Sequence, residues 1–434
     1  MTRGPAAAAR QPAAPTWPLA AAVLGTTSIA VGLLWDISWH ATIGRDTFWT
    51  PAHLALYLGG ILCGASAGWV ALATTFGGDA ARRDAAVRFW GFRAPLGAWV
   101  ATWGAIAMLT SAPFDDWWHN AYGLDVKIIS PPHVLLAAGI LAIQLGAMLL
   151  ALSAQNRLPA AGAAGANGAA AAPLSGRLPA LAYAYAAGLL LVILSTLFLE
   201  YSEPNRQHGA LYYEISCAAY PLILIGAARA ARLRWPATTI AGIYMAVRLA
   251  MTWILPLFPA TPMLAPITNP VHHMWPLFWP QLLVLPAIAL DLLLRRAGAT
   301  AGSPEEAAPA APATPAAPAA PAPATAGPAD AGRPPAAAGG RPLLLAAALG
   351  ASFLGVFLAV HWFFSELLLS PLSHNWFLAG DQWTYRTPAG PWHHQFWLDG
   401  DRLGVVAVLL SLALATVSAR LGLAWGAWME RVRR

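Results

Sequence analysis

Long apolar runs separated by short polar loops form the main pattern along the chain. A helix needs about 20 mostly apolar residues to cross a hydrocarbon core of ~30 Å. About ten runs approach this length, at residues 18–38, 52–76, 95–114, 132–153, 179–199, 211–230, 236–258, 274–294, 342–369 and 403–425. The pattern predicts an all-α fold, a polytopic transmembrane bundle of about ten spans.

Composition and charge agree with a membrane protein and indicate its orientation. Hydrophobic residues make up 58% of the chain and charged residues 10%, against roughly a quarter charged in soluble domains. Arginines occur in clusters in alternate loops and at the C-terminus, at 82–93, 157–177, 229–234, 295–296 and 431–434. Ten alternating spans place all of these clusters on one side, which is the positive-inside pattern. Both termini are therefore predicted to be cytoplasmic, in the plasma membrane of a bacterium. Because the basic residues are spread over short loops, the net charge of +6 does not indicate a nucleic-acid partner.

Composition also divides the chain into segments. Residues 1–17 form a cytoplasmic N-terminal tail, and residues 18–296 form an eight-helix membrane body. Residues 297–341 are rich in Ala and Pro, which predicts a disordered cytoplasmic linker. Residues 342–434 form a two-helix membrane tail whose outer loop is rich in Trp and His. The two cysteines lie inside apolar runs, so neither a disulfide nor a Cys-type metal site is expected.

The histidines are distributed on one side. All eleven fall toward or beyond the extracytoplasmic ends of the predicted helices, at positions 40, 53, 119, 133, 208, 272, 273, 361, 374, 393 and 394. Imidazole is the commonest metal ligand in proteins and titrates near neutral pH. This distribution indicates that the outer face uses imidazole.

Two segments about 79 residues apart repeat the same ligand-type residues. Both read Asp-x3-His, followed by Gly, Asp and a second His that comes soon after a Pro. The first copy contains Asp36, His40, Gly44, Asp46 and His53, and the second contains Asp115, His119, Gly123, Asp125 and His133. The spacing is identical except for one residue inserted before the last His.

The spacing predicts that each copy gathers its ligands. Asp and His four apart at a helix end lie on one face, the glycine lets the chain turn, and the proline starts the next helix. His53 and His133 then fall in a first turn beside the ligands of the preceding helix. One carboxylate and two imidazoles suit copper, zinc or iron with open coordination positions. Asp46 and Asp125, in the connecting turns, are expected to be second-shell acceptors that orient a histidine.

Other residues admit both a structural and a functional interpretation. The repeat itself is open to explanation as a duplicated structural hairpin beside an interfacial tryptophan belt, although that account does not explain the shared spacing. The polar loop 200–214, the pair at 272–273 and the outer loop 370–402 are more typical of interfacial loops. Arg248 lies near the middle of a predicted span, where arginine is costly and commonly functional, and no partner is obvious.

The repeated motifs resemble a known family. Asp36-x3-His40-x12-His53 looks like one copper-ligand motif of the C subunit of particulate methane monooxygenase and ammonia monooxygenase. Asp115-x3-His119-x13-His133 is similar to that subunit's second ligand set, with Asp where the family usually has Asn. The likeness covers residues 30–140, and this chain adds six helices and a linker. The resemblance implies a copper site, two partner subunits, and oxidation of a small apolar molecule by dioxygen.

Two main functional hypotheses follow. The first is a copper-dependent, monooxygenase-like membrane subunit that oxidises a lipophilic substrate arriving through the bilayer. The second is a metal permease or an outer-face metal receptor without catalysis, since repeated helix pairs also occur in transporters. A structural or assembly role is a third alternative. Whether the chain is an enzyme is left open by the sequence.

Overall fold

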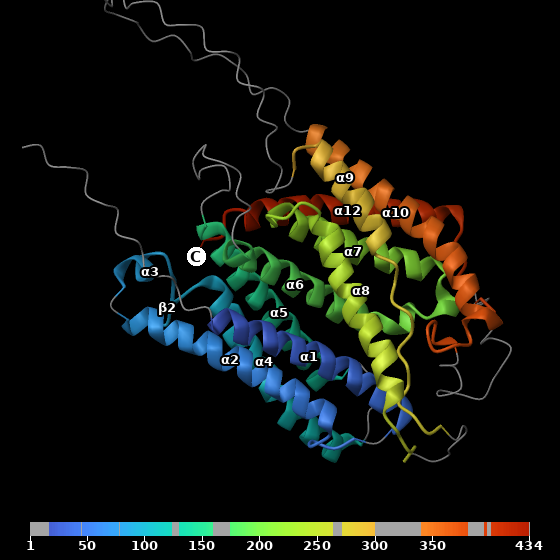
Figure 1. The fold of residues 1–434 in the computed structure, drawn as a ribbon, viewed down its shortest axis with the longest axis horizontal. Helices are drawn as coiled ribbons and strands as arrows, with labels where there is room; N and C mark the ends of the chain where they lie inside the picture. Colours follow the sequence, from blue (N-terminus) through green and yellow to red (C-terminus); the bar gives the residue numbers. More distant parts are fainter. Residues whose placement is uncertain are drawn as a thin grey trace, which may run out of the picture.

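The computed structural model describes residues 17–44, 46–77, 79–123, 130–158, 174–263, 271–299, 340–380, 395–396 and 401–433. The chain is mostly helical (Figure 1). Its first half contains the long helices α1 (Trp17–Thr42), α2 (Pro51–Phe76), α4 (Leu96–Tyr122) and α5 (Pro131–Arg157). Between α2 and α4 lie the short helix α3 (Ala80–Asp84) and the antiparallel strands β1 (Val87–Phe89) and β2 (Phe92–Ala94).

The second half contains α6 (Leu174–Leu197), α7 (Ala210–Ala230), α8 (Pro236–Ile254), α9 (Val284–Arg296), α10 (Gly340–Leu369) and α12 (Val405–Met429). Short 3-10 turns lie at η1 (Leu199–Tyr201), η2 (Pro204–Arg206), η3 (Leu255–Leu257) and η4 (Pro371–Ser373). Most of the predicted linker lies outside the described residues, as do the first 16 residues. The two-helix tail is not a separate appendage, because α12 packs closely against α7 and Ser418 Oγ donates to the Ala218 carbonyl.

Eight of the described helices are long and apolar enough to cross a membrane: α1, α2, α5, α6, α7, α8, α10 and α12. Two of the predicted spans fall outside this set. α4 is 27 residues long but less apolar, with Pro113 and two aspartates in its last turns. The predicted span 274–294 is wrong as a continuous helix, because α9 begins only at Val284. Pro276 and Pro280 precede it, and proline removes a helical donor and clashes with the preceding turn. The total of ten spans and the cytoplasmic termini stay predictions.

Two helical hairpins, α1–α2 and α4–α5, pack through glycines at equivalent positions. A Cβ atom on Gly25 would lie 2.9 Å from the Gly59 carbonyl oxygen, and one on Gly104 would lie 2.8 Å from the Gly139 carbonyl oxygen. Small residues allow this close approach of the backbones. In lipid, where the hydrophobic effect does not drive helices together, the van der Waals contacts of such close packing stabilise helix association. The duplicated motif is therefore part of a duplicated packing unit, α1–α2 and α4–α5.

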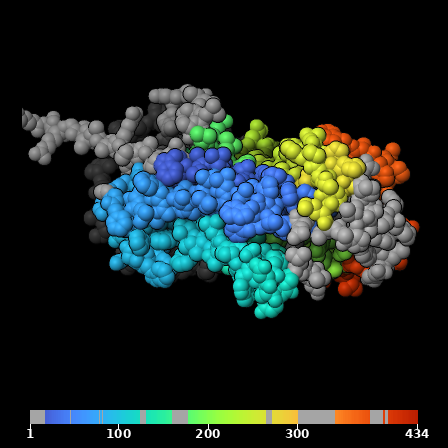
Figure 2. All heavy atoms as spheres, turned by 90° about the horizontal axis from the view of Figure 1, so that it is seen from below, coloured from blue at the N-terminus to red at the C-terminus, as the bar shows by residue number. Residues whose placement is uncertain are grey.

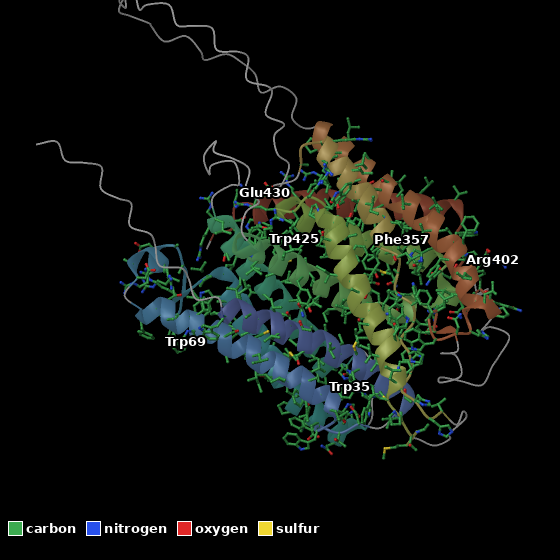
Figure 3. All side chains as sticks on the ribbon, viewed as in Figure 1. Trp35, Trp69, Phe357, Arg402, Trp425 and Glu430 are labelled. Carbon is green, nitrogen blue, oxygen red and sulfur yellow. The ribbon has the colours of Figure 1, made fainter. Side chains whose placement is uncertain are left out.

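The two ends of the bundle carry different side chains. At one end the C-terminal residues of α5, α7 and α12 meet, where Arg229 pairs with Glu430 at 3.0 Å and Arg157 donates to the Arg433 carbonyl. Figure 3 shows Glu430 near this end, with Trp35 and Arg402 toward the other. The helix ends that carry the Asp and His motifs lie at this second end. The arginines at the C-terminal ends of α5, α7 and α12 thus lie at the opposite end of the bundle from the Asp and His motifs, and which side of a membrane each end faces stays a prediction.

Candidate metal centres

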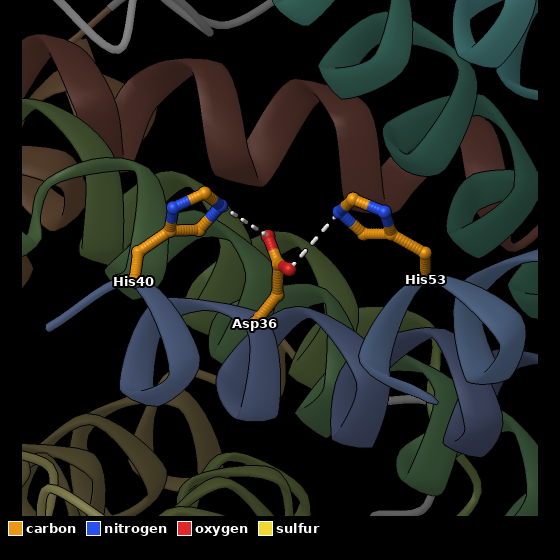
Figure 4. A group of neighbouring side chains, drawn as sticks. All are labelled: Asp36, His40 and His53. Atoms are coloured by element: carbon orange, nitrogen blue, oxygen red, sulfur yellow. Dashed lines mark ion pairs between the residues drawn. The ribbon is translucent and has the colours of Figure 1, made fainter. Parts of the chain in front are cut away.

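The first Asp/His motif converges at the junction of α1 and α2. Asp36 and His40 lie one turn apart at the end of α1, and His53 lies in the first turn of α2. Both imidazoles point at the Asp36 carboxylate from opposite sides (Figure 4). The Asp36 carboxylate is 3.1 Å from Nε2 of His53 and 3.7 Å from Nε2 of His40. The three ligand atoms lie within 4.8 Å of one another, as the sequence predicts.

The chain turns sharply between these two helices. Gly44 follows α1 with φ of +81°, a conformation that favours glycine, and its N–H donates to the Trp39 carbonyl. Thr47 and Thr50 then close a tight turn, with the Thr47 N–H donating to Thr50 Oγ1 at 2.8 Å. Pro51 begins α2, where its missing N–H costs nothing. This turn places His53 beside Asp36.

The second motif repeats this geometry at the junction of α4 and α5. Asp115 Oδ2 is 3.4 Å from Nε2 of His119, and Asp115 Oδ1 is 3.5 Å from Nε2 of His133. Gly123 caps α4 with φ of +86° and donates its N–H to the His119 carbonyl. These three ligand atoms also lie within 4.8 Å of one another. Asp125 lies outside the described residues.

The separations suit a bound transition-metal ion. Metal–nitrogen and metal–oxygen bonds of about 2.1 Å in a tetrahedral site put neighbouring ligand atoms about 3.4 Å apart. The carboxylate-to-imidazole distances in the two clusters run from 3.1 to 3.7 Å. Each carboxylate-to-imidazole separation is therefore close to the spacing expected for two ligands of one ion.

Backbone carbonyls fix one imidazole in each cluster. His53 Nδ1 donates to the Thr47 carbonyl at 2.9 Å, and His119 Nδ1 donates to the Gly123 carbonyl at 3.2 Å. In the neutral ring this leaves the lone pair on Nε2, which faces a carboxylate oxygen in each case. Two acceptors in contact repel each other unless a proton or a metal ion lies between them. The arrangement therefore fits a cation, and the carbonyls take the orienting role that the sequence assigned to aspartates.

Asp46 contacts both histidines of the first cluster. Its Oδ2 atom is 3.4 Å from Nε2 of both His40 and His53, so it shares the side of the rings that faces Asp36. That it orients a histidine stays a prediction, and its position beside both rings makes it a further ligand candidate. The hydrogen bond from the His40 imidazole holds the pKa of the Asp46 carboxyl below its ordinary value. Helix periodicity did not predict that Asp46 contacts both rings, because a residue in a turn does not belong to a fixed face of a helix.

The two clusters lie at the same level on adjoining helices. A Cβ on Gly60 of α2 would lie 3.3 Å from Met108 Sδ of α4. His53 lies seven residues before Gly60 on α2, and Asp115 lies seven residues after Met108 on α4. Because the two helices are antiparallel, both residues lie about two turns from this contact toward the same end. Packed helix axes lie about 8–10 Å apart, so the clusters are neighbours. Tyr57, one turn after His53, is within electrostatic range of Asp36 and Asp115.

Sequence reasoning missed Tyr57 and the packing glycines, although a signal was present. Gly25 and Gly104 keep the 79-residue offset of Asp36 and Asp115, and Gly59 and Gly139 keep the 80-residue offset of the second histidines. An alignment of the two copies beyond their polar residues would have found the glycines. Tyr57 has no counterpart in the second copy, where Ala137 lies at the 80-residue offset, and only the packing of α2 on α4 indicates it.

The chain segment before α9 covers the end of α1. The Met263 N–H donates to the Ile43 carbonyl, and the Trp275 N–H donates to Thr42 Oγ1. Figure 2 shows the yellow surface of this part of the chain beside the blue surface of α1 and α2. Trp275 therefore packs on the face of α1 that carries Ser38 and Thr42, and the side chains of His272 and His273 are exposed.

The other candidate histidines form no metal group among the described residues. His208 of the 200–214 loop stacks between Trp362 and Phe396, so this loop belongs with α10 and not with the clusters. His361 is buried with Nε2 accepting from the Leu282 N–H and Nδ1 facing Gln207 Oε1. His393 and His394, with most of the outer loop 370–402, lie outside the described residues.

Comparisons with protein-family models, curated proteins and solved structures give no match, so the fold and the two clusters carry the functional argument.

Proposed function

We propose that this chain is a membrane metalloprotein that binds one transition-metal ion at each of its two repeated Asp/His clusters. The observation that carries the proposal is the pairing of a carboxylate oxygen with an imidazole Nε2 lone pair, fixed by a carbonyl on Nδ1, in both copies. A duplicated structural hairpin would require neither the common orientation nor the spacing of ~3.4 Å expected for ligand atoms.

We further propose that the metal is copper and that the chain belongs to a monooxygenase-like assembly. The basis is the motif resemblance, together with a setting suited to lipophilic substrates. His40 is 48% exposed whereas Asp36 and His53 are 17% exposed, so the His40 side is where a small apolar molecule reaches the first cluster. Bound copper would supply one-electron chemistry with dioxygen.

The interior of the helices α1, α2, α4 and α5 suits a metal ion that stays bound better than one that is transported. Below the clusters, the helices α1, α2, α4 and α5 carry no further Asp, Glu or His toward the arginine end. Their contact surfaces are instead closed by Gly25 against Gly59 and by Gly104 against Gly139. An ion leaving either cluster would find no carboxylate or imidazole along this path, only sulfur groups such as those of Cys63 and Met108, which disfavours the permease alternative.

Metal stoichiometry tests the first proposal. Purified full-length protein is loaded separately with copper and with zinc, and bound metal is measured by mass spectrometry after removal of excess ion. We expect two ions in the wild type, one in Asp36→Asn, one in Asp115→Asn and none in the double variant. Asp116→Asn is the matched control, because this exposed neighbour of Asp115 contacts Asn120 and lies outside the cluster. Two ions retained in the double variant would contradict the assignment.

Isotope incorporation tests the second proposal. Membranes of the native host, which retain any partner subunits and the reductant, are given ¹⁸O₂ and a short alkene or alkane. Oxidation places one ¹⁸O atom in the product and the other in water, with two electrons and two protons from a membrane quinol. We expect labelled product in the wild type and none in the Asp36→Asn, Asp115→Asn double variant. Metal binding without any labelled product would leave a receptor as the better description.

A further inference from the structure

Arg248 is a buried charge in the middle of α8. It is 2% exposed and among the largest fully buried side chains. Its Nη2 atom donates to the Phe278 carbonyl at 3.2 Å, whereas Nε and Nη1 have no hydrogen-bond partner. Three of the five guanidinium N–H donors therefore point into the bundle without an acceptor.

No carboxylate in the described part of the chain pairs with this guanidinium at 4.0 Å or less. Asp291 of α9 is already committed at the start of α8, because it accepts from the N–H groups of Ala237 and Thr238 and from the Thr238 hydroxyl. Arginine does not lose its proton in proteins, so it cannot escape the cost of a buried unpaired charge by becoming neutral.

Other buried polar groups on α7, α8 and α10 either have no partner or are already paired. The hydroxyls of Tyr212 and Tyr213 on α7 are buried without a partner. Tyr212 stacks on Phe357, labelled in Figure 3, with ring centroids 5.5 Å apart. Tyr244, one turn before Arg248, donates to Gln281 Oε1 at 2.6 Å and therefore uses that acceptor. Both nitrogens of the neighbouring His361 have partners as well.

We propose that Arg248 binds an anion inside the bundle, between α8 and the segment before α9 that carries Phe278. The ligand carries a carboxylate or a comparable oxyanion group, because such oxygens accept several N–H and O–H donors at once. Two sources offer this chemistry: an amphiphile that enters from the bilayer, and a small anion from water. This site is separate from the metal clusters and does not depend on them.

Ligand-induced thermal stabilisation of the purified full-length protein tests the assignment. The probes are decanoate, acetate and chloride, with methyl decanoate as the uncharged control for chain length. We expect an anion to raise the Tm of the wild type and methyl decanoate to have no effect. Half-maximal stabilisation at a decanoate concentration at least tenfold below that of acetate identifies an amphiphile. Equal potency of decanoate, acetate and chloride identifies a small anion.

Two variants locate the effect. Arg248→Gln should abolish the shift, and Arg248→Lys should raise the half-maximal concentration several-fold, because it keeps the charge but loses the planar guanidinium fork. If Arg248→Gln does not fold, Arg248→Lys still distinguishes the outcomes. The proposal is overturned if no anion stabilises the wild type, or if the response of Arg248→Gln or of Arg248→Lys equals that of the wild type.

Discussion

The glycine contacts predict that a single methyl group will disable one metal site and spare the other. In Gly139→Ala the new Cβ atom would lie 2.6 Å from Met108 N and 2.8 Å from the Gly104 carbonyl oxygen. Both atoms belong to the α4 backbone, so no side chain can move aside. Ordinary contacts at a Cβ atom begin at 3.4 Å, which requires α5 to move away from α4 by about 0.8 Å.

That displacement is large for a metal site. It adds up to about 0.8 Å to the 3.5 Å separation of Asp115 Oδ1 from His133 Nε2, beyond the ~3.4 Å edge of a tetrahedral site. We expect affinity at the second site to fall at least tenfold, the scale of outer-shell disruptions. Overpacking should also cost about 1–3 kcal/mol of stability.

Equilibrium dialysis with zinc and thermal unfolding measure both effects. Gly59→Ala is the reciprocal variant, since its Cβ would meet the Gly25 carbonyl oxygen and weaken the first site instead. Gly68→Ala is the control, because no atom lies within 4 Å of its Cβ position. Two undisturbed sites in Gly139→Ala would refute the view that the glycines set ligand geometry.

Three further predictions concern the clusters. Asp46→Asn should weaken metal binding at the first site at least tenfold and leave the second unchanged, measured by the same dialysis; equal affinity at the first site in variant and wild type would contradict a role of Asp46 in that site. In the metal-free protein the pKa of Asp46 is lowered by its hydrogen bond with His40, so its stabilising contribution is present above the ordinary value of 3.8 and lost as pH falls through the lowered value. The Tm difference between wild type and Asp46→Asn should therefore shrink below that pH. Saturating metal at a hundred times Kd should stabilise the fold by about 2.7 kcal/mol per site, and a chelator should reverse the gain; a Tm insensitive to metal would contradict preformed sites.

Apolar run length predicted most helices because each buried or lipid-facing span must satisfy its own backbone. The prediction of one continuous helix at 274–294 was wrong because Pro276 and Pro280 interrupt the backbone hydrogen bonding of an otherwise apolar run. The length of an apolar run does not reveal such an interruption. The Asp and His ligands were predictable because residues four apart on a helix share a face.

The remaining parts of the site depend on tertiary packing or turn conformation. The Thr47 and Gly123 carbonyls orient histidines, but a carbonyl leaves no trace in side-chain sequence. The contact of Asp46 with His40 and His53 depends on the conformation of the turn between α1 and α2. The proximity of the two clusters follows from the packing of α2 on α4 at Gly60, which an apolar pattern does not specify.

The ligands of each cluster are close in the sequence as well as in space, with only 17 positions separating Asp36 from His53. Loop closure over so short a segment costs little entropy. Each cluster is complete once a single hairpin has formed, without any contribution from α6 to α12. During biogenesis the first cluster would therefore be ready for metal as soon as α1 and α2 have left the insertion machinery, while more than three hundred residues remain to be added.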